Sequence, residues 1–229
     1  MIYITGDTHG NFDRIENFCN KMKTTKDDIM IILGDAGINY FLNFRDTDCK
    51  RCLLGLPITF FCIHGNHEER PQNILTYREK EWNGGKVYFE YAFPNILFAN
   101  DGDIYDLDGK KCLVLGGAYS VDKNYRLTYG FNWFESEQMS NEQKLYAERN
   151  LNEIGNKVDI VFSHTCPRKY EPTEMFSQGV DQETVDKNTE DWLDTIEEKT
   201  EYEKWYCGHW HISKNTERLK FMFEDYGIL

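Results

Sequence analysis

Residues that could bind divalent metal ions follow five short apolar segments of the 229-residue sequence. They lie in the stretches GDTHG (6–10), GDAG (34–37), HGNHEE (64–69), SHTCP (163–167) and GHWH (208–211). The candidate ligands are two carboxylates, one amide and four imidazoles: Asp7, His9, Asp35, Asn66, His164, His209 and His211. This donor set suits borderline cations such as manganese, iron, zinc or nickel. It suits neither an all-oxygen calcium site nor a structural zinc site built from thiolates.

Two of these stretches place candidate ligands two residues apart. Asp7 and His9 have this spacing, as do His209 and His211. In an extended backbone, side chains at positions i and i+2 point in the same direction, so each pair could reach one cation. The carboxylate of Asp35 has two oxygens and could bridge two cations. Each motif alone is most often an ordinary turn, but five of them in succession indicate a metal site.

The segments before these motifs have the sequences of buried β-strands. Apolar runs at 2–5, 29–33, 58–63, 158–162 and 205–207 each end at a polar turn. Helical patterns occur at 11–22, 140–154 and 182–199, the second opening with Ser140 and Gln143 in capping-box spacing. Short runs at 86–91, 96–99, 104–107 and 111–115 are typical of hairpins. We therefore predict a single α/β domain over residues 1–229, with two sheets packed face to face and helices outside.

The composition argues against a protein that binds long nucleic acid or a membrane. The formal net charge is −13 and the pI is about 4.9, and no lysine and arginine cluster forms the basic surface that nucleic-acid phosphates require. A small phosphorylated substrate remains compatible, because bound cations reverse the local charge. No apolar run approaches the roughly 20 residues of a membrane helix.

The cysteines favour a cytoplasmic protein. Seven cysteines are spread along the chain, and the N-terminus lacks the pattern of a signal peptide. We expect reduced thiols. Cys49 and Cys52 form a lone CxxC pair, which we interpret as ordinary helix positions because a second pair is missing.

The five motifs, in this order, resemble those of the calcineurin-like metallophosphoesterase superfamily. The resemblance runs from Gly6 to His211 and implies a four-layer αββα sandwich, in which two mixed sheets carry a dinuclear metal site at their ends. It implies three ligands for one ion, namely Asp7, His9 and His211. It implies three ligands for the second ion, namely Asn66, His164 and His209. Asp35 would bridge both ions, and His67 would lie off the metals, near the leaving group.

The chain departs from one branch of this superfamily. Protein serine/threonine phosphatases have GDxVDRG at the second motif, whereas this sequence reads GDAGINY and lacks that aspartate and arginine. The GDTHG and GNHE motifs do resemble that branch. The stretch GGAYSVDKNYRL (116–127) resembles a block in uncharacterised bacterial and phage members, which implies no particular substrate.

The resemblance implies hydrolysis of phosphate esters by a hydroxide that bridges two divalent cations. We expect manganese, with iron, zinc or nickel as alternatives. We expect His67 to donate a proton or a hydrogen bond to the leaving oxygen, and Glu68 to orient a ligand or the backbone behind it. Arg126 is a candidate phosphate-binding residue, since a guanidinium matches phosphate oxygens; a surface arginine among tyrosines is the alternative interpretation.

Three functions are compatible with the sequence. The expected function is that of a phosphatase acting on small phosphorylated molecules or phosphopeptides. The alternative is a phosphodiesterase acting on nucleotides or short nucleic acid. A non-catalytic scaffold is disfavoured, because every expected ligand and His67 are present. The oligomeric state does not follow from the sequence.

Overall fold

The central strands of the first sheet have apolar sequences that are buried on both faces. In the computed structural model, which describes residues 1–229, its seven strands lie in the order β13-β1-β2-β3-β6-β5-β4. The central four run parallel: β1 (Ile2–Thr5), β2 (Ile29–Ile32), β3 (Thr59–Cys62) and β6 (Phe93–Ala99). The others run antiparallel to their neighbours: β4 (Arg78–Trp82), β5 (Gly85–Glu90) and β13 (Gly227–Ile228).

The second sheet has six strands in the order β11-β12-β10-β9-β8-β7. Its parallel strands are β8 (Lys110–Leu115), β9 (Ile160–Ser163), β10 (Lys204–Cys207) and β12 (Leu219–Phe221). Antiparallel strands close its edges, β7 (Ile104–Leu107) and β11 (Lys214–Asn215). Both sheets are therefore mixed, as predicted.

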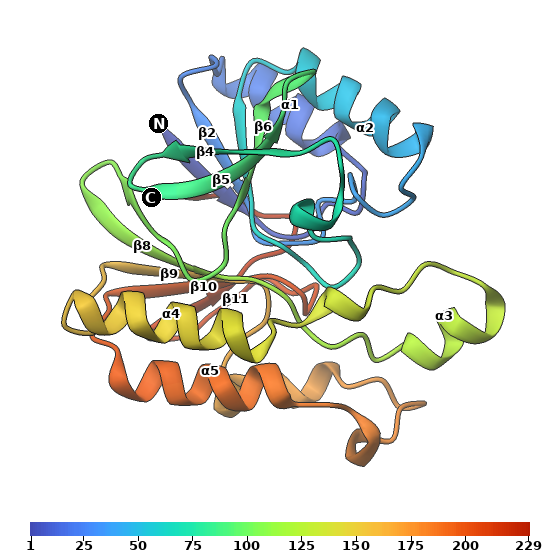
Figure 1. Ribbon diagram of the computed structural model, residues 1–229, viewed down its shortest axis with the longest axis vertical. Coiled ribbons are helices and arrows are strands. Elements are labelled where there is room, and N and C mark those ends of the chain that lie inside the picture. The colour runs from blue at the N-terminus through green and yellow to red at the C-terminus, as the bar shows by residue number, and fades with distance from the viewer.

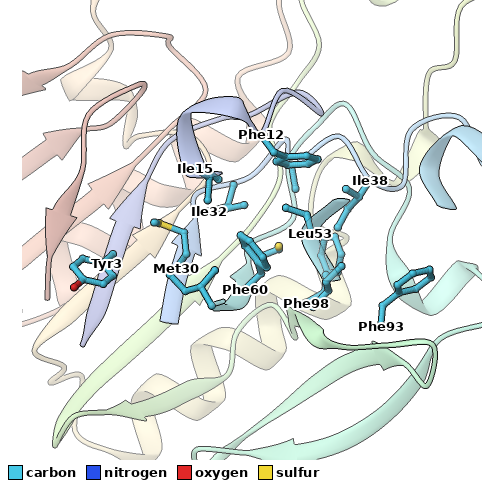
Figure 2. Packing of buried hydrophobic residues seen from close by; sticks show 14 of the residues in the cluster. Tyr3, Phe12, Ile15, Met30, Ile32, Ile38, Leu53, Phe60, Phe93 and Phe98 are labelled. Atoms are coloured by element: carbon cyan, nitrogen blue, oxygen red, sulfur yellow. The ribbon is translucent and has the colours of Figure 1, made fainter. Parts of the chain in front are cut away.

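The alternation of side chains along each strand sorts them into two cores. Met30, Ile32 and Phe60 point toward the helices on the first sheet (Figure 2). Ile31 and Phe61, their neighbours in sequence, point the other way and join side chains of the second sheet in the core between the sheets. Burial on both faces explains why these strands are continuously apolar.

Helices cover the outer face of each sheet. Helices α1 (Asp13–Met22) and α2 (Phe44–Gly55) bury Ile15 and Leu53 against the first sheet. Helices α4 (Asn141–Glu153) and α5 (Asn188–Lys199) bury Leu151 and Leu193 against the second. The four layers are visible in Figure 1 and confirm the predicted αββα sandwich. None of the helices combines the length and the hydrophobicity that a membrane crossing requires.

Two helical segments differ from the prediction. The pattern at 182–199 becomes a helix only from Asn188, whose backbone N–H is bonded by the side chain of Asp186. The preceding residues form a short 3₁₀ turn, Gln182–Thr184. Helix α3 (Lys123–Tyr129) was not predicted; it buries no residue and projects from the sandwich (Figure 1). The capping box of Ser140 and Gln143 is confirmed.

Candidate metal centre

The predicted ligands lie at the carboxyl ends of parallel strands from both sheets. Each sits in the turn that follows its strand: Asp7 and His9 after β1, Asp35 after β2, Asn66 after β3, His164 after β9, and His209 and His211 after β10. Parallel strands place their carboxyl ends at one edge of a sheet. Because the two sheets meet face to face, these edges come together, and residues up to 204 positions apart in sequence converge.

One group contains Asp7, His9 and His211, the set that the resemblance assigns to one ion. Asp7 Oδ2 lies 3.3 Å from His211 Nε2 and 3.8 Å from His9 Nε2. The two imidazole Nε2 atoms are 2.9 Å apart. Asp7 Oδ2 is buried and accepts no hydrogen bond. A buried carboxylate oxygen without a donor is costly unless a cation satisfies it, so this group fits a divalent ion.

A second group contains Asn66, His164 and His209. Asn66 Oδ1 lies 2.8 Å from His164 Nε2 and 3.1 Å from His209 Nδ1. His164 Nδ1 lies 2.8 Å from the Leu33 carbonyl oxygen, to which it donates, so in the neutral ring Nε2 is a bare acceptor. Asn66 Nδ2 donates to Ser120 Oγ at 2.9 Å, which turns Oδ1 toward the histidines. Acceptors that face one another need a cation between them, so this group also fits a divalent ion.

Asp35 lies between the two groups. Its Oδ2 is 3.9 Å from His9 Nδ1 and 3.8 Å from His164 Nε2. Its Oδ1 accepts the backbone N–H of His67 at 2.8 Å. One carboxylate oxygen therefore faces both groups, and the other is fixed by the backbone. This is the position that a bridging ligand requires.

The electrostatics of the site keep Asp7, Asp35 and His209 in their metal-binding forms, whereas Asp7 raises the pKa of His211. Burial raises the pKa of Asp35, but its interactions with the rings of His164 and His67 outweigh this effect and hold the pKa below its usual range. Burial likewise opposes ionisation of Asp7, whose pKa is nevertheless lowered, chiefly by His211. Burial lowers the pKa of His209 to about 3. At neutral pH the carboxylates are charged and this imidazole is neutral, as metal coordination demands.

The backbone is strained where it presents these side chains. His9, Asp35, His209 and His211 have φ angles of 47°, 48°, 66° and 49°. Non-glycine residues rarely adopt this left-handed region, and each such residue costs roughly 1–3 kcal/mol. The extended backbone that we expected at Asp7–His9 and His209–His211 is therefore not observed, and His209 and His211 lie in different ligand groups. Four strained residues among seven ligands indicate that the surrounding packing imposes their geometry.

Glycines allow the turns to approach one another. A Cβ atom on Gly65 would overlap the Asp35 carboxylate, and one on Gly208 would overlap the Asp7 carboxylate. Glu68, which is fully buried, accepts the N–H of Gly65 at 3.0 Å. This contact places Glu68 behind the site, in the backbone-orienting position that we predicted. Burial raises its pKa to about 8.

His67 lies beside the candidate ligands, with a ring nitrogen within 4.8 Å of a ring nitrogen of His9 and a carboxylate oxygen of Asp35. Its Nδ1 contacts Arg126 Nη2 at 2.6 Å. Arg126 also donates from Nε to Asp122 Oδ2 at 2.8 Å and from Nη1 to Tyr40 Oη at 3.0 Å. All three guanidinium nitrogens are engaged. The predicted phosphate-binding role of Arg126 stays a prediction, and its contact with His67 was not foreseen.

The site opens into a cleft of about 410 Å³. Besides five of the candidate ligands and His67, it is lined by Tyr119, Val121 and Asp122. Residues between positions 175 and 190 form another wall, which includes Met175, Phe176, Val180, Val185, Asp186, Lys187 and Glu190. The sequence does not mark this wall, because its residues carry no motif and those from 182 onward were predicted as part of a helix. Burial raises the pKa of Glu190 to about 7.

Comparisons with known proteins agree with this geometry. The model of the calcineurin-like phosphoesterase family matches residues 1–213. Among solved structures, the phosphopantetheinyl hydrolase of Mycobacterium tuberculosis aligns with a TM-score of 0.53 at 13% identity, over 97% of this chain and 87% of that chain. Another solved structure aligns with a TM-score of 0.52 at 14% identity, over 96% of this chain and 88% of that chain. Comparison with curated proteins gives no match.

The two solved structures share the fold with this chain. The family match goes further, because it spans every strand-end turn from Asp7 to His211. The chain therefore belongs to the calcineurin-like phosphoesterase family and is a metal-dependent phosphoesterase.

Proposed function

We propose that this protein is a phosphatase that hydrolyses monoesters of small phosphorylated molecules or phosphopeptides. The observation that carries the proposal is the placement of two ligand groups on either side of Asp35, with His67 beside them and a cleft in front. A phosphate ester in the cleft could present its phosphoryl oxygens to both groups and its leaving oxygen to His67.

The proposal assigns two divalent cations to the site. Asp7, His9 and His211 would hold the first. Asn66, His164 and His209 would hold the second, and Asp35 would contact both. We propose manganese as the metal, with iron, zinc or nickel as alternatives, because imidazole-rich sets with carboxylates suit all four. When bound, the cations lower the pKa of water and stabilise charge on the phosphoryl oxygens.

The chain's own groups then orient the reaction. Ser120 fixes the Asn66 amide with its oxygen toward the site, and the Leu33 carbonyl fixes the His164 ring. Such supporting contacts hold ligands in one geometry and are typically worth 10- to 100-fold in metal affinity. His67 would stabilise the leaving oxygen, by a hydrogen bond or a proton. Help of this kind contributes roughly 10²–10⁴ in rate.

The lining of the cleft supports a small substrate with little additional negative charge. Asp122, Asp186 and Glu190 contribute carboxyl groups. Lys187, the one lysine in the lining, is paired with Glu171 at 2.8 Å. Long nucleic acid would find no free cation on these walls. The phosphopantetheinyl hydrolase shares only the fold at 13% identity, so its substrate supports no assignment here.

A phosphodiesterase acting on nucleotides is the second candidate. The cleft is large enough for a second ester substituent, and Tyr119, Phe176 and Trp210 offer aromatic surface to a base. This candidate differs from the first in one measurable property, the ability to cleave a phosphate that carries two ester bonds.

The test compares p-nitrophenyl phosphate with bis-p-nitrophenyl phosphate. The metal content of the purified protein is measured first, and manganese is added before assay. We expect kcat/KM for the monoester to exceed that for the diester. The reverse order would replace the proposal by the diesterase. If neither ester is hydrolysed at full metal loading, the site is that of a non-catalytic scaffold.

We also propose a cytoplasmic location. All seven cysteines are free, and Cys19, Cys62, Cys112, Cys166 and Cys207 are buried. Buried free thiols are usual in reducing compartments. Localisation of the tagged protein by fractionation tests this proposal.

A further inference from the structure

The contact between Arg126 and His67 determines which ring nitrogen of His67 carries the hydrogen. Arginine has donors but no acceptor, and it stays charged at all accessible pH values. At the observed 2.6 Å, Arg126 Nη2 must donate to His67 Nδ1. Nδ1 is therefore the acceptor, and the single hydrogen of the neutral ring lies on Nε2. An imidazolium would place an N–H on Nδ1 against the guanidinium, which this geometry forbids.

This tautomer restricts the chemistry open to His67. To bind a cation through Nε2, the ring needs a bare lone pair there, but that position carries the hydrogen. To act as a full acid, the neutral ring would have to become an imidazolate, which is too basic to form near neutral pH. What remains is donation of a hydrogen bond from Nε2–H. Of the two roles proposed for His67 above, only this one agrees with the Arg126 contact.

The arginine is itself held in place from several sides. Asp122 Oδ2 accepts from Nε at 2.8 Å, and Tyr40 Oη and the Asn132 carbonyl oxygen accept from Nη1 at 3.0 and 3.3 Å. The side chain is 14% exposed. Four contacts on one planar fork leave the guanidinium little freedom, so its donor toward His67 is preorganised.

We infer that Arg126 is a positioning residue, which fixes His67 as an Nε2–H donor to the leaving oxygen. The inference rests on the proposed hydrolytic function and deepens it. His67 keeps its proton throughout; the leaving oxygen departs as an anion that accepts this hydrogen bond and takes its proton from water. The site should therefore favour esters of acidic alcohols, above all phenols, over esters of simple aliphatic alcohols.

A series of substituted phenyl phosphates tests the inference. The dependence of kcat/KM on the leaving-group pKa is measured for the parent protein and for Arg126→Met, His67→Ala and the double variant. We expect Arg126→Met to lower kcat for the poorest leaving groups about 10- to 100-fold and for the best ones several-fold. In the His67→Ala background, the same substitution should change kcat by less than about twofold, because the two residues act as one unit.

A phosphate-binding role for Arg126 gives a different result. In that case Arg126→Met would raise KM for all leaving groups alike, and the loss would persist without His67. This outcome would overturn the inference. The matched control is Arg149→Met, at an exposed arginine on α4, which should leave both kinetic constants unchanged. If Arg126→Met folds poorly, Tyr40→Phe can replace it. This variant removes one contact of the guanidinium and should lower kcat in the same direction but by a smaller factor.

The tautomer can also be observed without turnover. Long-range ¹H–¹⁵N correlation spectra of the zinc-loaded protein distinguish Nδ1–H from Nε2–H rings. We expect His67 to be protonated on Nε2 in the parent protein and to show a mixture of tautomers in Arg126→Met. A His67 ring protonated on Nδ1 in the parent, or lower zinc content in His67→Ala, would overturn the inference. These spectra remain decisive if the parent protein hydrolyses no ester, an outcome that contradicts only the proposed function.

Discussion

The strand-end turns and the outer walls of the cleft are built differently. In the turns, Asp7, Asp35 and His164 are at most 2% exposed. The backbone of the turns is strained at several residues, including Asp35, and glycines allow the turns to pack closely against one another. The outer walls come from residues 119–122 and 175–190, where Val121 and Met175 are 50% and 45% exposed. The sandwich therefore fixes the geometry of the candidate ligands, whereas more exposed loops line the cleft in front of them.

The largest effect should follow from removing the residue between the two ligand groups. Asp35→Ala takes away a carboxylate that faces both groups, and the loss of metal-centred charge stabilisation is worth several kcal/mol. We expect kcat/KM to fall by at least about 10³-fold, with a loss of bound metal measured by mass spectrometry. Retention of both metals and of activity would show that the strand-end turns do not form the metal centre.

A smaller effect is expected one contact away from the ligands. Ser120→Ala removes the hydroxyl that accepts from Asn66 Nδ2, so the amide can rotate its oxygen away from the site. We expect metal affinity, measured by competition with a chelator, to fall roughly 10- to 100-fold. Ser136→Ala serves as the control, because its hydroxyl bonds Glu69 rather than a ligand. Equal losses in both variants would argue for general destabilisation.

The stability of the cleft wall should depend on pH, because the wall buries a carboxyl group that the proposed mechanism does not use. The pKa of Glu190 rises from 4.5 to about 7 through burial. Between these values the unfolded chain has lost its proton while the folded one retains it, so the contribution of Glu190 to stability falls as pH rises and stays low above pH 7.

Replacing this carboxyl by an amide should remove the loss of stability that Glu190 causes at high pH. We expect Glu190→Gln to be more stable than the parent at pH 8 by on the order of 1–3 kcal/mol, with little difference near pH 4.5. Urea denaturation at both pH values measures this. Glu183→Gln, at an exposed position of the same segment, should change stability at neither. A Glu190→Gln variant that is less stable at pH 8 would show that the carboxylate is charged and paired.

The smallest effect should come from the exposed part of the cleft wall. Met175 lines the cleft but packs loosely, with 45% of its surface exposed. We expect Met175→Ala to change KM by no more than about threefold and to leave kcat and metal content unchanged, since surface truncations rarely exceed ±0.5 kcal/mol. A large fall in kcat would contradict the division between chemistry in the turns and selection in the loops.

Much of the architecture could be read from local patterns. Runs such as residues 29–33 are apolar throughout because β2 is buried on both faces, and this pattern predicts a central parallel strand. Helix α4 begins where Ser140 and Gln143 form their capping box. Helix α3 was missed because none of its residues is buried, so no apolar periodicity marks it. The start of α5 was misplaced because Val185, which resembles a core position, faces the cleft.

The candidate ligands could be identified from the sequence alone, because each lies within four residues of a strand end and the strands are locally encoded. The contacts that those groups make with distant residues followed only from the three-dimensional packing. Arg126 and His67 are 59 residues apart, and no periodicity links α3 to the turn after β3. Their contact, like the wall at residues 175–190, depends on long-range packing of exposed segments, which leaves no repeating signal in the sequence.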